Sequence, residues 1–183
     1  SGVILSQMIR GFAEAFDGTT HATHTDLIMA VTNASDTAYA AVSNPVEGTM
    51  LTVLREAATH AREHLQADSD GEAVLLTMVD EAYASVERTP DLLPRLREAG
   101  VVDAGGAGVA VILDGIVRHL CGTPLPEAPR YAGTEQVQTD AVEHEGHGYC
   151  TEFIVLGEGI DLAAIERGLT EAGGDSLLVV GEH

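Results

Sequence analysis

The chain has 183 residues, and 45% of them are hydrophobic, so it is long and apolar enough to bury a core. Acidic residues number 29 and basic residues nine, all of them arginine, which gives a formal net charge of −20. This charge disfavours binding to nucleic acid and to anionic membranes. The absence of lysine excludes a Walker-A phosphate loop and Schiff-base chemistry within the chain.

Neither export nor membrane insertion is expected from the sequence. No apolar run approaches the ~18 to 20 residues that a membrane helix needs, and no basic stretch precedes an apolar segment as in a signal peptide. Two cysteines, Cys121 and Cys150, are too few for a disulfide framework. We therefore expect a cytoplasmic protein. Because an amphipathic segment begins directly after Ser1 and Gly2, we also expect that upstream sequence precedes this chain.

The first part of the chain, residues 1–121, is predicted to form about six helices joined by short loops. Apolar side chains recur at helical spacing over residues 3–16 and 25–43. Four later helix starts are predicted. The first is at Asn44-Pro45, where Glu47 can bond back, and the second is at the capping box Ser69-Asp70-Gly71-Glu72. The third is at Thr89-Pro90, for a helix that ends at Gly100, and the fourth is at the glycine-rich turn 103–108, for a helix that ends at Leu120. These elements make the region all-α.

The character of the chain changes after Cys121. Residues 122–136 contain three prolines and are predicted to be a linker between domains. Residues 137–183 are predicted to begin an α/β domain, with a strand over 150–156, a helix that Asp161 can cap and that runs through Ala172, and a second strand over 176–180. The expected fold is therefore mainly α, followed by a partial α/β domain.

Two helix starts could bind a nucleotide. The turn at 103–108 offers exposed N–H groups and a helix dipole, which suit an anionic ligand, although it lacks the spacing of a Rossmann fingerprint. The alternative is a helix start whose small residues allow close packing. Similarly, Thr49 and Met50 could line an adenine pocket, or they could be a helix cap and a core residue.

One histidine- and cysteine-containing segment could bind a metal. His144, His147 and Cys150 fall within seven residues, and both residue types bind Zn²⁺. A structural zinc site usually has four protein ligands, so a solvated loop beside a buried cysteine is the alternative.

Three motifs occur in an order and at separations that together resemble a known family. They are SGVILSQ at 1–7, EGTML at 47–51 and VDAGGAG at 102–108, and they resemble the ATP-binding domain of the dihydroxyacetone-kinase L-subunit (DhaL) class. The segment GYCTEF at 148–153, after the proline-rich linker, is similar to the bacterial fatty acid kinase catalytic subunits, or YloV-type proteins. The resemblance covers essentially the whole chain.

The resemblance implies an antiparallel eight-helix barrel, truncated here at its N-terminal side, with ATP and Mg²⁺ at one end. It implies ATP contacts by Ser1 and Gly2 around the phosphates, by Thr49 and Met50 beside the nucleotide, and by Asp103, Ala104 and Gly105 against the base or ribose. It also implies that Cys150 is a metal ligand or reactive thiol of the middle domain, where Zn²⁺ is the candidate ion.

Proteins of this family phosphorylate the carboxylate of a fatty acid that a separate lipid-binding carrier protein presents. The family's Asp-rich Mg²⁺ loop would lie upstream of Ser1, and the His-x-His segment that would join Cys150 would lie beyond His183. We therefore expect no catalytic residue in this chain and no kinase activity from it alone. The alternatives are a dihydroxyacetone kinase or phosphotransfer L-type subunit, and a non-catalytic helical module that docks a partner; a homodimer is left open.

Overall fold

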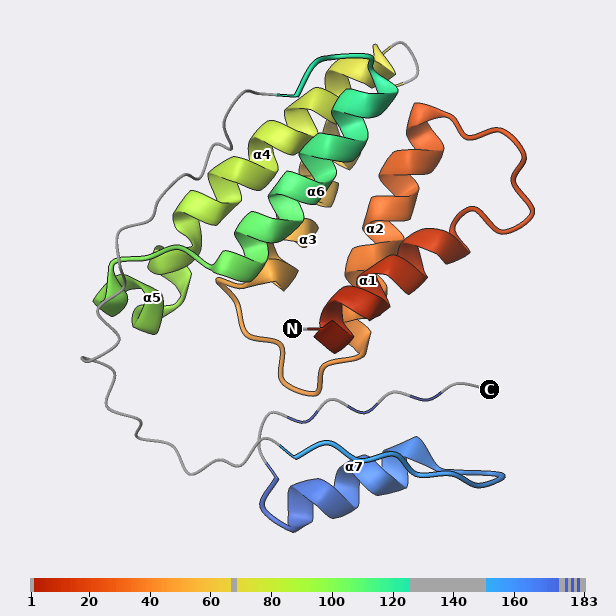
Figure 1. Cartoon of the computed structure of the whole chain (residues 1–183), viewed down its shortest axis with the longest axis vertical. Helices are drawn as coiled ribbons and strands as arrows, with labels where there is room; N and C mark the ends of the chain where they lie inside the picture. The colour runs from red at the N-terminus through yellow and green to blue at the C-terminus, as the bar shows by residue number, and fades with distance from the viewer. Residues whose placement is uncertain are drawn as a thin grey trace.

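The computed structural model describes residues 2–66, 69–125 and 151–174, together with residues 177, 179 and 181. The helices of these residues are α1 (Gly2–Glu14), α2 (His24–Ala40), α3 (Met50–His64), α4 (Gly71–Leu92), α5 (Pro94–Ala99), α6 (Ala104–Leu120) and α7 (Leu162–Glu171) (Figure 1). Six of them precede the proline-rich linker, so the predicted helix count for residues 1–121 is confirmed. None of these helices is both long and apolar enough to cross a membrane.

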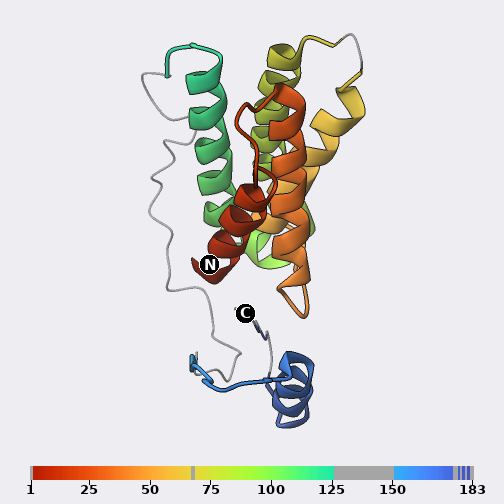
Figure 2. The same cartoon turned by 90° about the vertical axis from the view of Figure 1, so that its right-hand side faces the viewer.

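The first six helices form an antiparallel bundle. From α1 to α4 each helix packs on the one before it, and α6 packs on both α3 and α4. Long helices that follow one another along the chain run in opposite directions, so α1, α3 and α6 all begin at the lower end of the bundle in Figure 1, and Figure 2 shows the same arrangement from the side. The mainly helical fold is thus confirmed, whereas a closed barrel is not.

The core of the bundle is aliphatic. Side chains from four of its helices are almost fully buried: Ile28 and Val31 of α2, Val53 of α3, Leu75, Met78 and Val86 of α4, and Val117 of α6. They come from the apolar stripes that recur at helical spacing in the sequence, because such a stripe faces the other helices of a bundle. Burying one such side chain contributes about 1.5–3 kcal/mol.

The predicted start of the third helix is wrong. The helix begins at Met50 rather than after Asn44, and Thr49 is its N-cap. Gly48 has φ +81, a left-handed conformation that does not continue into a helix. Glu47 bonds to Arg55 instead of capping, so residues 44–49 form a loop.

The capping box predicted for the fourth helix is also wrong. Asp70, not Ser69, is the N-cap of α4, and its Oδ1 accepts a hydrogen bond from the Glu72 N–H at 3.1 Å. The Ser69 hydroxyl instead accepts from the Gln66 N–H at 2.8 Å. Ser69 thus stabilises the loop before α4, and its neighbour Asp70 caps the helix.

A helix boundary was predicted at Thr89-Pro90, but α4 continues through Pro90 to Leu92. Proline has no N–H, so it leaves the carbonyl of the residue four positions earlier without its helical donor. Here the Thr89 hydroxyl donates to that carbonyl, Val86 O, at 2.6 Å. The prediction for Gly100 is confirmed, because it ends α5 with φ +65.

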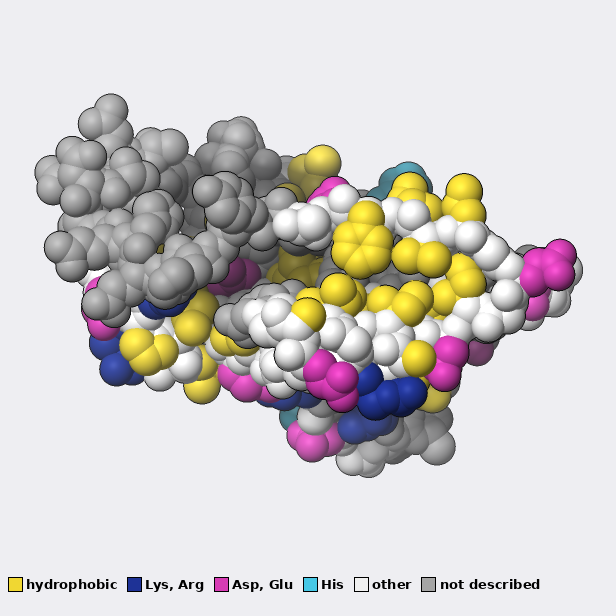
Figure 3. Space-filling view, turned by 90° about the horizontal axis from the view of Figure 1, so that it is seen from below, with side chains coloured by type: hydrophobic (Ala, Val, Ile, Leu, Met, Phe, Trp, Pro, Cys, Tyr) yellow, Lys and Arg dark blue, Asp and Glu magenta, His cyan; other side chains and the backbone are white. Residues whose placement is uncertain are grey.

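The C-terminal part is described in fragments. Asp161 caps α7 by accepting from the Ala164 N–H at 3.0 Å, as predicted. Residues 151–157 have no strand, and Ile154 and Leu156 are 87% and 90% exposed. Figure 3 shows that hydrophobic side chains are exposed on the face of the molecule seen from below. A strand needs a paired neighbour, and the described part of the chain provides none for this segment. The predicted strand–helix–strand unit is therefore not confirmed.

Candidate functional site

The starts of α3 and α6 lie against each other at the lower end of the bundle, and two glycines make this contact possible. A Cβ on Gly106 would lie 2.8 Å from Val53 Cγ2 of α3, and a Cβ on Gly105 would lie 3.3 Å from Met50 Cε. The distance at Gly106 leaves no room for a side chain unless α6 or Val53 shifts, and the distance at Gly105 is tight, so the two glycines let α6 approach α3 closely. The result is a pair of adjacent helix N-termini, each carrying a partial positive charge.

Asp103 fixes the start of α6. Its Oδ2 accepts a hydrogen bond from the Gly106 N–H at 2.5 Å, which makes it the N-cap, and its own N–H donates to the buried Thr89 hydroxyl at 3.0 Å. The N–H groups of Ala104 and Gly105 stand in the first turn, where a helix has no acceptors of its own. Such N–H groups are suited to phosphate or carboxylate oxygens.

Thr49 and Met50 fix the start of α3. The Thr49 hydroxyl donates to Val46 O at 2.8 Å and accepts from the Leu51 N–H at 3.4 Å, so it closes the loop as well as capping the helix. Met50 is 9% exposed and packs beneath Gly105. Its side chain thus lies in the core contact between α3 and α6. This agrees with the alternative interpretation of the sequence, in which Met50 is a core residue.

An ionised cluster supports the loop before α3, and sequence reasoning missed it. The guanidinium of Arg55 donates to both carboxylate oxygens of Glu47, at 2.6 and 2.9 Å. The hydroxyls of Thr52 and Tyr39 donate to the same carboxylate, at 2.6 Å for Thr52 and 3.2 Å for Tyr39. Glu47 and Arg55 are eight residues apart across a loop, and no local pattern predicts such a pair.

The charge state of this cluster follows from its contacts. Burial disfavours the charged form of Glu47, but the hydrogen bonds from Arg55 and Thr52 outweigh it and lower the pKa of the carboxyl below its ordinary value. The bond to Glu47 raises the pKa of Arg55, against the opposing effect of burial. The Arg55 guanidinium also lies 5.3 Å from the centre of the Tyr39 ring, within the range of a cation–π contact. The pair is therefore ionised at neutral pH.

The C-terminal turns of α4 join the two loops of the site. A Cβ on Gly48 would lie 2.9 Å from both Leu93 Cβ and the Thr89 carbonyl, so the loop before α3 packs directly on α4. The hydroxyl of the same Thr89 holds the backbone of Asp103 before α6. One segment of α4 thus sets the positions of both helix starts.

The residues expected to contact ATP lie mostly at one end of the bundle. Thr49, Met50, Asp103, Ala104 and Gly105 meet at the starts of α3 and α6. The first residue of α1, Gly2, lies toward the same end (Figure 1). Ser1 falls outside the described residues.

The metal candidates His144, His147 and Cys150 also fall outside the described residues. Within the part of the chain that the structure describes, no group of three or more His, Cys, Asp or Glu side chains is placed to hold a metal ion. The described residues therefore suit the anionic part of a nucleotide but do not form a Mg²⁺ or Zn²⁺ centre.

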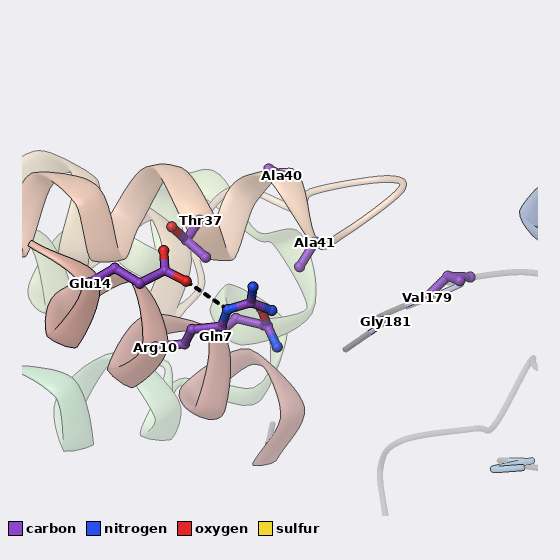
Figure 4. Close-up of a pocket in the computed structure, with 8 residues that line it drawn as sticks. All are labelled: Gln7, Arg10, Glu14, Thr37, Ala40, Ala41, Val179 and Gly181. Atoms are coloured by element: carbon purple, nitrogen blue, oxygen red, sulfur yellow. Dashed lines mark hydrogen bonds and ion pairs between the residues drawn. The ribbon is translucent and has the colours of Figure 1, made fainter. Parts of the chain in front are cut away.

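Two cavities lie away from these helix starts. One, of about 120 Å³, is lined by apolar side chains that include Leu5, Met8 and Phe12 of α1 and Val109, Ile112 and Ile116 of α6. It offers no polar side chain to a charged ligand. The other, of about 300 Å³, lies between α1, α2 and residues 179 and 181. There Arg10 and Glu14 pair with each other at 2.8 Å (Figure 4), so the arginine is already neutralised.

Comparison with known proteins gives a consistent result. The model of the DAK2 domain matches residues 1–118. The chain is 34% identical to protein YloV of Bacillus subtilis over 201 residues, an alignment that covers 100% of this chain and 35% of that protein. It is 35% identical, with the same coverage, to uncharacterized proteins of Staphylococcus saprophyticus and Staphylococcus haemolyticus. The chain thus spans about a third of the length of these curated relatives.

Proposed function

Because the chain belongs to the DAK2 domain family, we propose that residues 1–121 are the nucleotide-binding part of an ATP-dependent kinase. A DAK2 domain is a dihydroxyacetone-kinase-like module, which makes ATP the expected nucleotide. The observation that carries the proposal is the pair of adjacent helix starts, α3 capped by Thr49 and α6 capped by Asp103. In a chain without lysine, phosphates must be held by backbone N–H groups, a metal ion or arginine, and these helix starts supply backbone N–H groups and favourable dipoles.

The residues have separable roles in this proposal. The resemblance implies that Ala104 and Gly105 lie against the base or ribose, but their N–H groups in the first turn of α6 suit phosphate oxygens, and the dipoles of α3 and α6 favour the negative charge. Asp103 orients the first turn of α6 and is placed to accept a hydrogen bond from a nucleotide hydroxyl. A divalent ion supplies charge neutralisation in phosphoryl transfer, but the described residues form no site for it.

We infer further that the phosphoryl acceptor is the carboxylate of a fatty acid presented by a lipid-binding carrier protein. The support is the resemblance of residues 148–153 to the fatty acid kinase family, and the alignment with YloV, which extends over the whole chain. Cys150, with His144 and His147 close to it in the sequence, is the zinc candidate of the same region. A dihydroxyacetone kinase or phosphotransfer L-type subunit, which would use the same nucleotide site, is the alternative.

Titration of ATP with Mg²⁺ into the full-length protein tests the nucleotide site. We expect binding by the wild type and weaker binding by Asp103→Ala, by roughly 1–3 kcal/mol, the cost of losing a hydrogen bond to a charged group. Asp103→Ser keeps a capping oxygen without the charge, so it separates the two functions of this residue. Asp161→Ala removes the cap of α7 and serves as a matched control.

The outcomes discriminate among the candidate functions. No detectable ATP binding by the wild type would favour a non-catalytic docking module. Full affinity in Asp103→Ser would reduce Asp103 to a cap. If ATP binds, acyl-phosphate formation with a fatty-acid-loaded carrier, set against phosphorylation of dihydroxyacetone, identifies the acceptor. We expect the chain 1–183 alone to form no acyl phosphate.

A further inference from the structure

The Glu47 carboxylate has more donors than a loop carboxylate at the surface usually attracts. Its side chain is 42% exposed, yet three side chains donate to it: Arg55 and Thr52 from α3, and Tyr39 from α2. Exposed ion pairs contribute little to stability, typically about 0–1 kcal/mol. A cluster this complete is more than the stability of the loop alone requires.

The contact that leads from this cluster to the site passes through Thr52. The Thr52 hydroxyl donates to Glu47 Oε2 at 2.6 Å and accepts from the Gly48 N–H at 2.9 Å. Thr52 is 0% exposed, so water does not replace either bond. Glu47 therefore sets the direction of the Thr52 hydroxyl, and the Thr52 hydroxyl sets the backbone of Gly48.

Gly48 is the residue that must be held. Its φ of +81 places the chain in a conformation that a free glycine leaves readily, because glycine samples many backbone conformations. It packs on Thr89 of α4 and on Leu93, the C-cap of that helix, and directly precedes Thr49, the cap of α3. If Gly48 moves, the first turn of α3 loses its place beside Asp103 and Gly105.

We propose that Glu47 and Thr52 are positioning residues of the nucleotide site, which hold the 46–49 loop so that the starts of α3 and α6 meet the ligand together. The inference rests on the proposed function. Arg55 also contributes to the nucleotide site, because it neutralises the charge of Glu47. An unpaired carboxylate at this end of the bundle would repel an anionic nucleotide.

The test uses paired substitutions in the full-length protein, with MgATP as the probe. Thr52→Val is nearly isosteric and changes no charge, but it removes the bonds to both Glu47 and Gly48. Thr52→Ser restores the hydroxyl. Glu47→Gln removes the charge that Arg55 binds. Thr32→Val on α2 is the control, since the Thr32 hydroxyl only donates to Ile28 O of its own helix.

We expect Thr52→Val and Glu47→Gln to raise the KM for ATP by about tenfold, the effect of losing one such hydrogen bond, with kcat changed less. Thr52→Ser and Thr32→Val should stay near the wild type. Amide hydrogen exchange at Gly48 should become faster in Thr52→Val. A merely structural role would lower the melting temperature without this separation of KM from kcat.

Two results would overturn the proposal. One contradicts only the positioning role, and the other contradicts the proposed function as well. If the wild type binds ATP and Thr52→Val binds it equally well, while exchange at Gly48 is faster, the loop is held by Thr52 but does not position the nucleotide. If the wild type binds no ATP, the proposed function itself is wrong and the positioning role falls with it.

Discussion

The Thr89 hydroxyl makes two hydrogen bonds that serve different elements. It donates to Val86 O, the carbonyl that Pro90 leaves without a helical donor, and it accepts from the Asp103 N–H before α6. Thr89 is 0% exposed, so both partners would be left without a replacement from solvent. A single buried hydroxyl thus makes a proline inside α4 tolerable and fixes the start of α6.

Replacement of Thr89 by valine should therefore be costly despite the similar shape. We expect Thr89→Val to lower the free energy of unfolding by about 1–3 kcal/mol, the cost of leaving buried polar groups unsatisfied. Thr77→Val on the same helix is the control, because the Thr77 hydroxyl bonds only to Val74 O, which also has its helical N–H donor. Urea unfolding measures both variants, and equal losses would contradict the role of Thr89.

The stability contributed by Glu47 should depend on pH. Its pKa is lowered in the folded protein, so the contribution is fully present above the unfolded-state pKa of about 4.3 and is lost as the pH falls through the folded value. We expect Glu47→Gln to be less stable than the wild type at pH 7, by less than about 1 kcal/mol because the side chain is partly exposed. The difference should shrink toward pH 3.

Urea unfolding at a series of pH values measures this difference directly. Glu87→Gln, an exposed position on α4, controls for the loss of one negative charge. A gap between Glu47→Gln and the wild type that stays constant from pH 7 to pH 3 would show that ionisation of Glu47 contributes nothing. In that case only the shape of the loop would matter.

At the scale of an element, α6 carries glycines in two different roles. Gly106 faces α3, where an added Cβ would lie 2.8 Å from Val53 Cγ2. Gly115 lies further along the same helix, and an added Cβ there would have no neighbour within 4 Å. The first glycine is required by packing between helices, whereas the second only weakens the helix.

The two glycines should respond to alanine with opposite signs. Gly115→Ala should stabilise the protein by about 0.5–1 kcal/mol, because alanine is the better helix former. Gly106→Ala should destabilise it, since overpacking costs about 1–3 kcal/mol and outweighs the same gain in propensity. Thermal unfolding of both variants gives the signs. Stabilisation by Gly106→Ala would show that α6 can move away from α3 at little cost.

At the scale of the whole molecule, net charge is the dominant feature. A formal charge of −20 on 183 residues means that repulsion between carboxylates opposes the compact state. A few local pairs reduce this repulsion, such as Arg88, which bonds to Glu56 of α3 and Glu81 of α4. Nine arginines cannot neutralise 29 acidic residues, so the repulsion should remain measurable in the folded chain.

Salt should therefore stabilise this protein. Raising the NaCl concentration from about 0.01 M to about 1 M shortens the Debye length from about 30 Å to about 3 Å and screens the repulsion. We expect the melting temperature to rise by several degrees, since about 1 kcal/mol corresponds to roughly 2–4 °C for a chain of this size. KCl should act alike. A fall in melting temperature would mean that local ion pairs outweigh the net charge.

The sequence by itself determined the helical class, the buried stripes, the helix start at the turn 103–108 and the cap Asp161, because apolar periodicity and short-range capping are local properties of the chain. Only the tertiary structure decided where α3 begins, since the left-handed Gly48 and the Glu47–Arg55 pair depend on packing between loop, α2, α3 and α4. The same holds for the juxtaposed starts of α3 and α6. Residues 47–52 and 103–106 are distant in sequence, and the antiparallel course of α4 and close contacts at Gly105 and Gly106 bring them together.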